Sequence, residues 1–159
     1  MAKVKVAIMM GSKSDMSVME AAGQVLEGFG VEFEIKVLSA HRTPKETTEY
    51  AESLKARGVQ AVICGAGMSA ALSGVVAAHT TLPVIGVPLN ASDLDGLDAL
   101  LSTVQMPPGV PVACVAVGKA GAKNAAFLAL RMLALSDPAV EAKLMDYREQ
   151  ERKKILGGA

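Results

Sequence analysis

The chain contains very few aromatic side chains. Of its 159 residues, three are Phe, two are Tyr and none is Trp, an aromatic share of only 3%. Apolar residues still make up 51% of the sequence, so the core must be built from Ala, Val, Leu, Ile and Met. A chain of this length buries enough surface for one domain, and we predict a single domain over residues 1–159.

The sequence also has no excess of charge of either sign. Sixteen Lys and Arg residues balance sixteen Asp and Glu residues, and the formal net charge is zero. A protein that follows a nucleic-acid backbone needs a basic surface, so nucleic acid is not an expected partner. This balance leaves room for one small phosphorylated ligand.

Cysteine is scarce, and the chain starts directly with strand-like sequence. Cys64 and Cys114 both lie in apolar runs, where a thiol usually serves as a small buried hydrophobe. No CxxC or Cys/His spacing indicates zinc. The opening "KVKVAIMMG" does not have the pattern of a signal peptide, and we expect a reduced, cytoplasmic protein.

Two long segments lack Asp, Glu, Lys and Arg altogether. Residues 58–92 form the first and residues 99–118 the second. Gly and Pro interrupt the first segment repeatedly, which favours two short buried strands around a buried helix over a membrane span. Together the segments exceed what the core of one small domain needs. We therefore also predict a buried subunit interface.

Strand-like and helix-like patterns alternate along the chain. The expected strands are residues 3–9, 32–38, 60–64, 83–87 and 111–117, and the expected helices are 15–29, 44–57, 70–79, 94–103, 119–135 and a charged last helix at about 137–155. This alternation predicts a parallel sheet covered by helices on both faces. Ligands of such folds bind beyond the carboxyl ends of the strands. The corners after the strands are therefore the candidate site.

The first corner, "MGSKSD", ends a strand and opens a helix. Ser12 and Ser14 offer hydroxyls and amides, and a helix N-terminus favours an anion. Asp15 could cap the helix or accept hydrogen bonds from ligand hydroxyls, and the spacing alone favours capping.

The second corner, "SAHRTP", holds one of the two histidines of the chain. Arg42 suits a phosphate because its donors form a planar fork, and His41 can move a proton near neutral pH. The alternative is a solvent-facing pair at a helix start, with Thr43 as N-cap and Pro44 in the first turn.

The third corner, "GAGMSAALSG", is rich in small residues. Its backbone could approach a ligand closely and bind a carboxylate through amides, or the small residues could serve tight helix–strand packing. The second histidine, His79, falls at the end of the following helix, where it more often stabilises the helix dipole than takes part in catalysis.

Several motifs together resemble the carboxyaminoimidazole ribonucleotide mutase family of purine biosynthesis. They are "MGSKSD", "SAHRTP", "GAG", "LPVIGVP", "LDGLDALLSTVQMPPGVPVA" and "GKAGAKNAA", and they span roughly residues 4–135 in the family's order. The resemblance implies a flavodoxin-like three-layer α/β/α sandwich with a central parallel sheet. It also implies a homo-octamer, no metal and no organic cofactor, and as ligands a small ribonucleotide and carbon dioxide, with no membrane partner.

The resemblance also implies a reaction and roles for residues. These mutases convert N-carboxyaminoimidazole ribonucleotide to 4-carboxy-5-aminoimidazole ribonucleotide by decarboxylation and recarboxylation in a closed site. By motif match, His41 would carry the proton, Ser12 and Arg42 would hold the 5′-phosphate, and Asp15 would bind the ribose hydroxyls. Further substrate-binding residues expected from the same corners are Gly11, Ser14, Ser39, Gly67, Met68, Ser69 and Leu72.

The third corner departs from the mutase pattern, GAGGAAHLPG. Met68 replaces a glycine, Ala71 the second family histidine and Ser73 a proline. This loop is more similar to AGRSNALSG of the aminoimidazole ribonucleotide carboxylases, which use free carbon dioxide, although those enzymes usually carry Lys in place of Arg42. A mutase with an altered loop is the first expectation. Direct carboxylation is the main alternative, followed by a divergent carboxylase or decarboxylase and by a non-enzymatic nucleotide-binding module.

Overall fold

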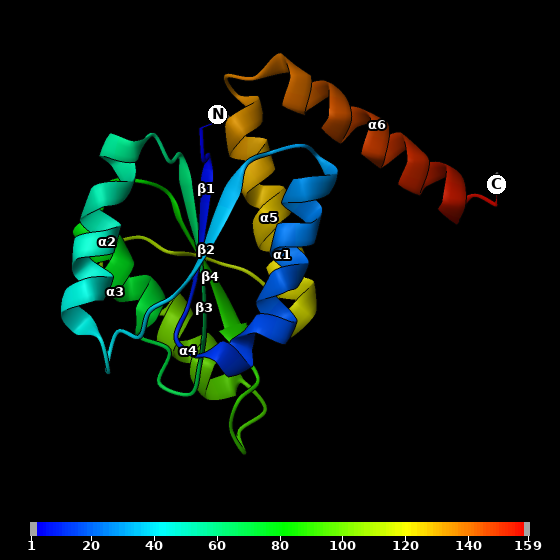
Figure 1. Ribbon diagram of the computed structural model, residues 1–159. Coiled ribbons are helices and arrows are strands. Elements are labelled where there is room, and N and C mark those ends of the chain that lie inside the picture. Colours follow the sequence, from blue (N-terminus) through cyan, green and yellow to red (C-terminus); the bar gives the residue numbers. More distant parts are fainter. Residues whose placement is uncertain (1–2, 158–159) are drawn as a thin grey trace.

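The computed structural model describes residues 3–157, and within them strands and helices alternate (Figure 1). The strands are β1 (Val6–Met10), β2 (Phe33–Val37), β3 (Ala61–Gly67), β4 (Val84–Leu89) and β5 (Ala113–Cys114). The helices are α1 (Met16–Gly28), α2 (Pro44–Arg57), α3 (Leu72–His79), α4 (Leu97–Val104), α5 (Gly118–Ala134) and α6 (Pro138–Ile155), and a short 3-10 helix, η1 (Lys13–Asp15), precedes α1.

The five strands form one parallel sheet in the order β2-β1-β3-β4-β5. This order confirms the predicted flavodoxin-like class. The chain first winds from β1 outward to β2 and then returns to the other side of β1 with β3. Met10, the last residue of β1, accordingly pairs with Val37 on one side and with Gly65 on the other. The loops after β1, β2 and β3 therefore emerge next to one another.

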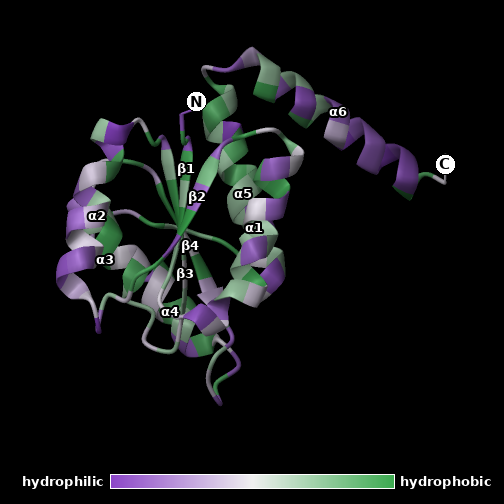
Figure 2. Ribbon diagram, in the orientation of Figure 1, coloured by the Kyte–Doolittle hydropathy of each residue, from purple (hydrophilic) through white to green (hydrophobic). Residues whose placement is uncertain are grey.

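Helices cover both faces of the sheet, and the alternation of side chains along each strand explains why. In β1, Val6, Ile8 and Met10 pack into the cluster shared with α1 and α5, while Ala7 and Met9 pack into the cluster shared with α2 and α3. All five residues are fully buried, as expected of a central parallel strand. Figure 2 shows the hydrophobic strands between the two helical layers.

All five strands differ in length from the prediction, and β5 differs the most. Strand β5 was expected over 111–117, but only Ala113 and Cys114 pair with β4, because β5 lies at the sheet edge and Pro111 has no N–H to donate. Strand β3 instead runs beyond its predicted end at residue 64, through Gly67, which pairs with Leu89. The GAG motif thus belongs to a strand end that β4 holds in place.

Helix α6 extends away from the two helical layers (Figure 1). It starts at Pro138, and the side chain of Asp137 accepts hydrogen bonds from the amides of Ala139 and Val140. Val140 and Leu144 are its buried residues, and most of the charged remainder is exposed. No helix within residues 3–157 has the length and apolar character that crossing a membrane requires.

An apolar stripe on and just before α4 faces solvent. Leu94, Leu97, Leu101 and Val104 are all among the exposed large hydrophobic residues. Leu97, Leu101 and Val104 are four and three residues apart, which places them on one side of α4, and Leu94 lies in the turn before the helix. They lie within or close to the uncharged segments from which we predicted a subunit interface, and that interface stays a prediction.

Candidate active site

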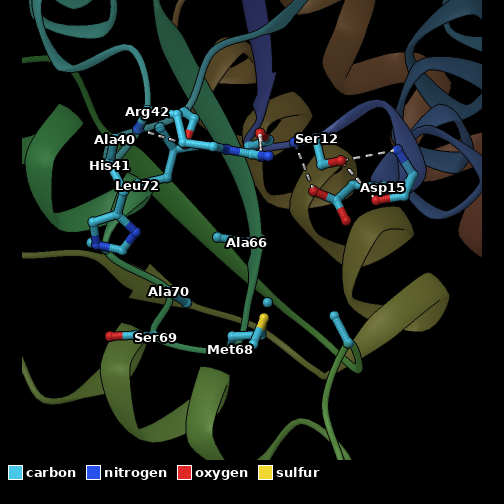
Figure 3. Close-up of a pocket in the computed structure, with 16 residues that line it drawn as sticks. Ser12, Asp15, Ala40, His41, Arg42, Ala66, Met68, Ser69, Ala70 and Leu72 are labelled. Atoms are coloured by element: carbon cyan, nitrogen blue, oxygen red, sulfur yellow. Dashed lines mark hydrogen bonds between the residues drawn. The ribbon is translucent and has the colours of Figure 1, made fainter.

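A pocket of about 540 Å³ opens at the carboxyl ends of β1, β2 and β3 (Figure 3). The loops after these three strands provide nearly all of its lining. All eleven residues selected from the sequence line it, namely Gly11, Ser12, Ser14, Asp15, Ser39, His41, Arg42, Gly67, Met68, Ser69 and Leu72. The sequence argument missed five small residues of the lining, Ala40, Ala66, Ala70, Ala71 and Ala91. The structure thus brings the three corners together, while the role of each residue remains to be proposed.

The loop after β1 is organised as a capping box. The Ser12 hydroxyl accepts from the Ser14 amide at 3.3 Å and lies 2.8 Å from the Ser14 hydroxyl. In return, the Asp15 carboxylate accepts from the Ser12 amide at 3.1 Å. Asp15 therefore caps η1 by reaching backwards, and its side chain makes no cap bond to α1. Asp15 thus caps the 3-10 helix and also lines the pocket, and its hydrogen bonds to ligand hydroxyls stay a prediction.

The environment of Asp15 favours its protonated form. Burial is the main cause and raises the pKa of the carboxyl group, while the hydrogen bond from the Ser12 amide and the nearby Arg42 guanidinium act in the opposite direction. Burial has removed water from around the carboxylate, and the hydrogen-bond donors of the protein replace that water only in part. A ligand that donates hydroxyl hydrogens to it would replace that lost solvation.

Arg42 connects the second corner to the first. Its Nη2 donates to the Gly11 carbonyl at 2.7 Å, and its Nε donates to the Ser39 hydroxyl at 3.4 Å. The Ser39 hydroxyl also accepts from the backbone amide of Arg42 at 3.2 Å. These two side-chain bonds engage two of the five guanidinium donors. The guanidinium is thus fixed beside Ser12 and retains donors for an anion.

A tight turn holds His41 at the pocket edge. The Thr43 hydroxyl accepts from the Ser39 amide at 2.9 Å and donates to the Ser39 carbonyl at 3.1 Å. Thr43 is the N-cap residue of α2 and Pro44 lies in its first turn, as predicted, although the Thr43 side chain makes no cap bond. The hydroxyl closes the turn instead. Figure 3 shows the imidazole on the side of Ser69 and Ala70, away from Asp15.

The loop after β3 contains an uncommon backbone conformation. Met68 has φ of +56°, a left-handed geometry that costs a non-glycine residue about 1 kcal/mol or more. Just before it, a Cβ on Gly67 would lie 2.5 Å from the Cβ of Ala91, so only glycine allows this close approach. Helix α3 then begins at Leu72, two residues later than predicted. Two of the three departures from the mutase pattern, Met68 and Ala71, fall in this turn, and the third, Ser73, lies in α3.

Ser73, at the start of α3, carries a buried hydroxyl without a partner. Its side chain is 2% exposed, and it is the one buried side-chain polar atom of residues 3–157 that makes no hydrogen bond. The mutase pattern has a proline here, which needs no such partner. The serine therefore reduces stability without contributing to the pocket lining.

His79 and the cysteines lie outside the pocket. The Nδ1 of His79, at the end of α3, is 3.0 Å from a carboxylate oxygen of Glu52 on α2. Burial raises the pKa of the Cys64 thiol and, to a lesser extent, that of Cys114, which makes both poor nucleophiles. Across residues 3–157, no group of three or more His, Cys, Asp and Glu side chains is arranged to hold a metal ion.

Comparison with known proteins identifies relatives over almost the whole chain. The family model described as AIR carboxylase matches residues 5–154. The N5-carboxyaminoimidazole ribonucleotide mutase of Pyrococcus abyssi is 54% identical over 149 residues, which are 94% of this chain and 84% of the relative. The Bacillus subtilis protein of the same name is 50% identical over 151 residues, or 95% and 93% of the two chains.

A solved structure supports the same relationship. The crystal structure of Treponema denticola PurE superposes with a TM-score of 0.87 at 33% sequence identity, covering 96% of this chain and 94% of that one. The curated relatives carry the mutase name despite the altered loop of this chain, so direct carboxylation is not the favoured alternative.

Proposed function

Because the chain belongs to the AIR carboxylase family, we propose that it is a mutase of purine biosynthesis. It converts N5-carboxyaminoimidazole ribonucleotide to 4-carboxy-5-aminoimidazole ribonucleotide. The observation that carries this proposal is the meeting of His41, Arg42, Ser12 and Asp15 in one pocket, in a chain about half identical to proteins named as this mutase. The pocket combines a proton carrier, an anion site and an acceptor for hydroxyls.

The proposed reaction rearranges the substrate without net oxidation. The bond between the exocyclic nitrogen and the carboxyl carbon breaks, and its electron pair stays on the nitrogen, which gains a proton. The ring carbon then attacks the released carbon dioxide, forms a carbon–carbon bond and loses its own proton. A protonated His41 supplies the proton to the nitrogen as a general acid and then takes up the ring-carbon proton as a general base, so it ends the turnover as it began. Every atom of the substrate is retained in the product.

Substrate binding follows from the donors and acceptors of the first two corners. The Arg42 guanidinium, the Ser12 hydroxyl and the amides at the start of η1 hold the 5′-phosphate. Asp15 accepts from the ribose hydroxyls, which replaces the solvation that burial has removed. Gly11, Ser14 and Ser39 complete this side of the site, while Gly67, Met68, Ser69 and Leu72 face the base and the migrating carboxyl group.

One specific observation favours direct carboxylation as a second candidate. Ala71 stands where the mutase pattern has a histidine, and Met68 stands where it has a glycine. The deciding experiment compares turnover of N5-carboxyaminoimidazole ribonucleotide with turnover of free aminoimidazole ribonucleotide at high bicarbonate and carbon dioxide. We expect efficient product formation only from the N-carboxylated substrate. If the free ribonucleotide with carbon dioxide is turned over efficiently and the N-carboxylated substrate is not, the protein is a carboxylase instead.

We further propose that the protein works as a homo-octamer in the cytoplasm. The support is the stripe of Leu94, Leu97, Leu101 and Val104 on and before α4, since contiguous apolar surface of this kind marks an interface. Light scattering coupled to gel filtration measures the assembly size. A Leu97→Glu, Leu101→Glu double variant is expected to elute as a smaller species, and a monomeric wild-type protein would contradict the proposal.

A further inference from the structure

The pocket has two chemically different sides. Ser12, Asp15 and Arg42 supply hydroxyl, carboxylate and guanidinium groups on one side. The opposite side is largely apolar, with Ala66, Ala70, Ala71, Leu72 and Ala91, and the Ser69 hydroxyl and the His41 imidazole also line the pocket there (Figure 3). Met68 projects from the loop after β3 with 59% of its surface exposed. In Figure 3 its thioether is directed toward the space between the two sides.

The position of Met68 is fixed by its neighbours. Gly67 pairs with Leu89 of β4 and packs against Ala91, and the Ala70 amide donates to the Met68 carbonyl at 2.9 Å. The turn between them holds Met68 at φ of +56°. A non-glycine residue keeps such a conformation only where the surrounding structure determines it. The side chain therefore starts from a rigid point, while its three rotatable bonds leave it adaptable.

The proposed reaction makes a particular demand on this side of the pocket. Between breakage of one bond and formation of the next, carbon dioxide is free, uncharged and small. Its recapture by the ring carbon competes with its escape to solvent. Ala71 offers no side-chain donor, and the donors left near this wall are the Ser69 hydroxyl and the His41 imidazole. An uncharged molecule gains little from such donors, so its retention depends mainly on closing off water and the exit.

We infer that Met68 is the specificity-determining residue that retains carbon dioxide in this protein, an inference that rests on the proposed mutase function. The thioether folds over the bound base and completes the apolar wall, so the released carbon dioxide stays beside the ring carbon until attack. Coverage by Met68 thus replaces retention by a second histidine. Met68 thereby favours transfer of the released carbon dioxide within the site over uptake of carbon dioxide from solution.

Isotope exchange tests this inference. N5-carboxyaminoimidazole ribonucleotide of natural abundance is supplied in ¹³C-bicarbonate with carbonic anhydrase, and the ¹³C fraction of the early product is measured together with released aminoimidazole ribonucleotide. A reaction without enzyme corrects for spontaneous decarboxylation. We expect little label with the wild type. Met68→Gly should raise both signals by roughly tenfold, comparable to a loss of apolar contacts in a pocket.

Met68→Leu is the matched variant, because it keeps the apolar bulk and loses only the sulfur. Its ¹³C fraction should stay close to that of the wild type. Wild-type labelling with Met68→Gly, or a Leu variant as leaky as the Gly variant, would overturn the inference. Glycine accepts the left-handed conformation, so Met68→Gly is expected to fold, and circular dichroism verifies this. A wild type that does not consume the N-carboxylated substrate would instead refute the proposed function.

Discussion

Replacement of Arg42 by alanine should weaken substrate binding much more than it slows the chemical step. In the free protein the guanidinium is already held by the Gly11 carbonyl and the Ser39 hydroxyl. It therefore meets the phosphate with little reorganisation. A phosphate is remote from the reacting ring atoms, and its contacts are the same in the ground state and the transition state. Loss of such uniform binding raises KM and leaves kcat nearly unchanged.

The size of the effect follows from the hydrogen bonds that are lost. A charge-assisted hydrogen bond contributes about 1.5–3 kcal/mol, and Arg42 lies at an exposed edge of the pocket, which favours the lower part of that range. A loss of about 2 kcal/mol corresponds to a decrease of roughly 30-fold in kcat/KM. Arg42→Lys should fall between the wild type and the alanine variant, because it keeps the charge but loses the planar fork.

Steady-state kinetics with the N-carboxylated substrate measures both parameters, and inhibition by inorganic phosphate gives an independent readout of the anion site. Phosphate should inhibit the wild type and have much less effect on Arg42→Ala. Lys45→Ala is the control with the same change of charge, since Lys45 lies nearby on α2 but does not line the pocket. A decrease in kcat as large as that in kcat/KM would show that Arg42 acts on the reacting atoms and would refute the phosphate assignment.

Three further predictions follow from the same geometry. His41→Asn should lose turnover by about 100-fold or more while product binding measured by calorimetry persists, and an unaffected kcat would exclude His41 as the proton carrier. Folding raises the pKa of the Asp15 carboxyl above 3.8, so the folded state binds more protons than the unfolded state, and this group lowers the free energy of unfolding as pH rises from 3.8 through the folded-state pKa. In urea unfolding, Asp15→Asn should therefore lose less of its unfolding free energy with rising pH than the wild type does. Equal pH dependences of the two proteins would contradict this. Ser73→Ala should stabilise the protein by about 1 kcal/mol because it removes a hydroxyl without a partner, which is roughly 3 °C in Tm. The control Thr103→Val should destabilise, since the Thr103 hydroxyl donates to the Ala99 carbonyl at 2.7 Å.

The sequence predicted the neighbourhood of the site because a parallel sheet imposes it. Once strands and helices alternate, the corners after β1, β2 and β3 must emerge at one edge. The polar residues at those corners made Ser12, His41 and Arg42 candidates without knowledge of any distance, and the family resemblance supplied their expected roles. The missed lining residues, such as Ala40 and Ala91, are alanines. Alanine fits helix, strand and core equally well, so nothing in the sequence distinguishes an alanine in a pocket wall from one in the core.

The individual bonds were beyond sequence reasoning, since each depends on backbone geometry across a corner. Nothing in "SAHRTP" shows that the Thr43 hydroxyl closes a turn on Ser39 and makes no cap bond to α2. Similarly, the backward reach of Asp15 requires the extended conformation of Ser12. The length of β3 was underestimated because glycine is a poor strand former, whereas pairing with β4 overrides that preference at Gly65 and Gly67.

The strand order explains why His41 and Arg42, although adjacent in sequence, face different parts of the pocket. Strand β1 lies between β2 and β3. The loop of Gly11 and Ser12 after β1 is therefore flanked by the corner after β2 on one side and by the loop after β3 on the other. From its position in that corner, Arg42 reaches sideways to the end of β1, while His41 faces the loop after β3 (Figure 3). One tight turn thus directs the two side chains to different parts of the pocket, as the proposed roles of phosphate anchor and proton carrier require. The loop after β3 then remains as the part of the pocket in which this chain departs from the mutase pattern.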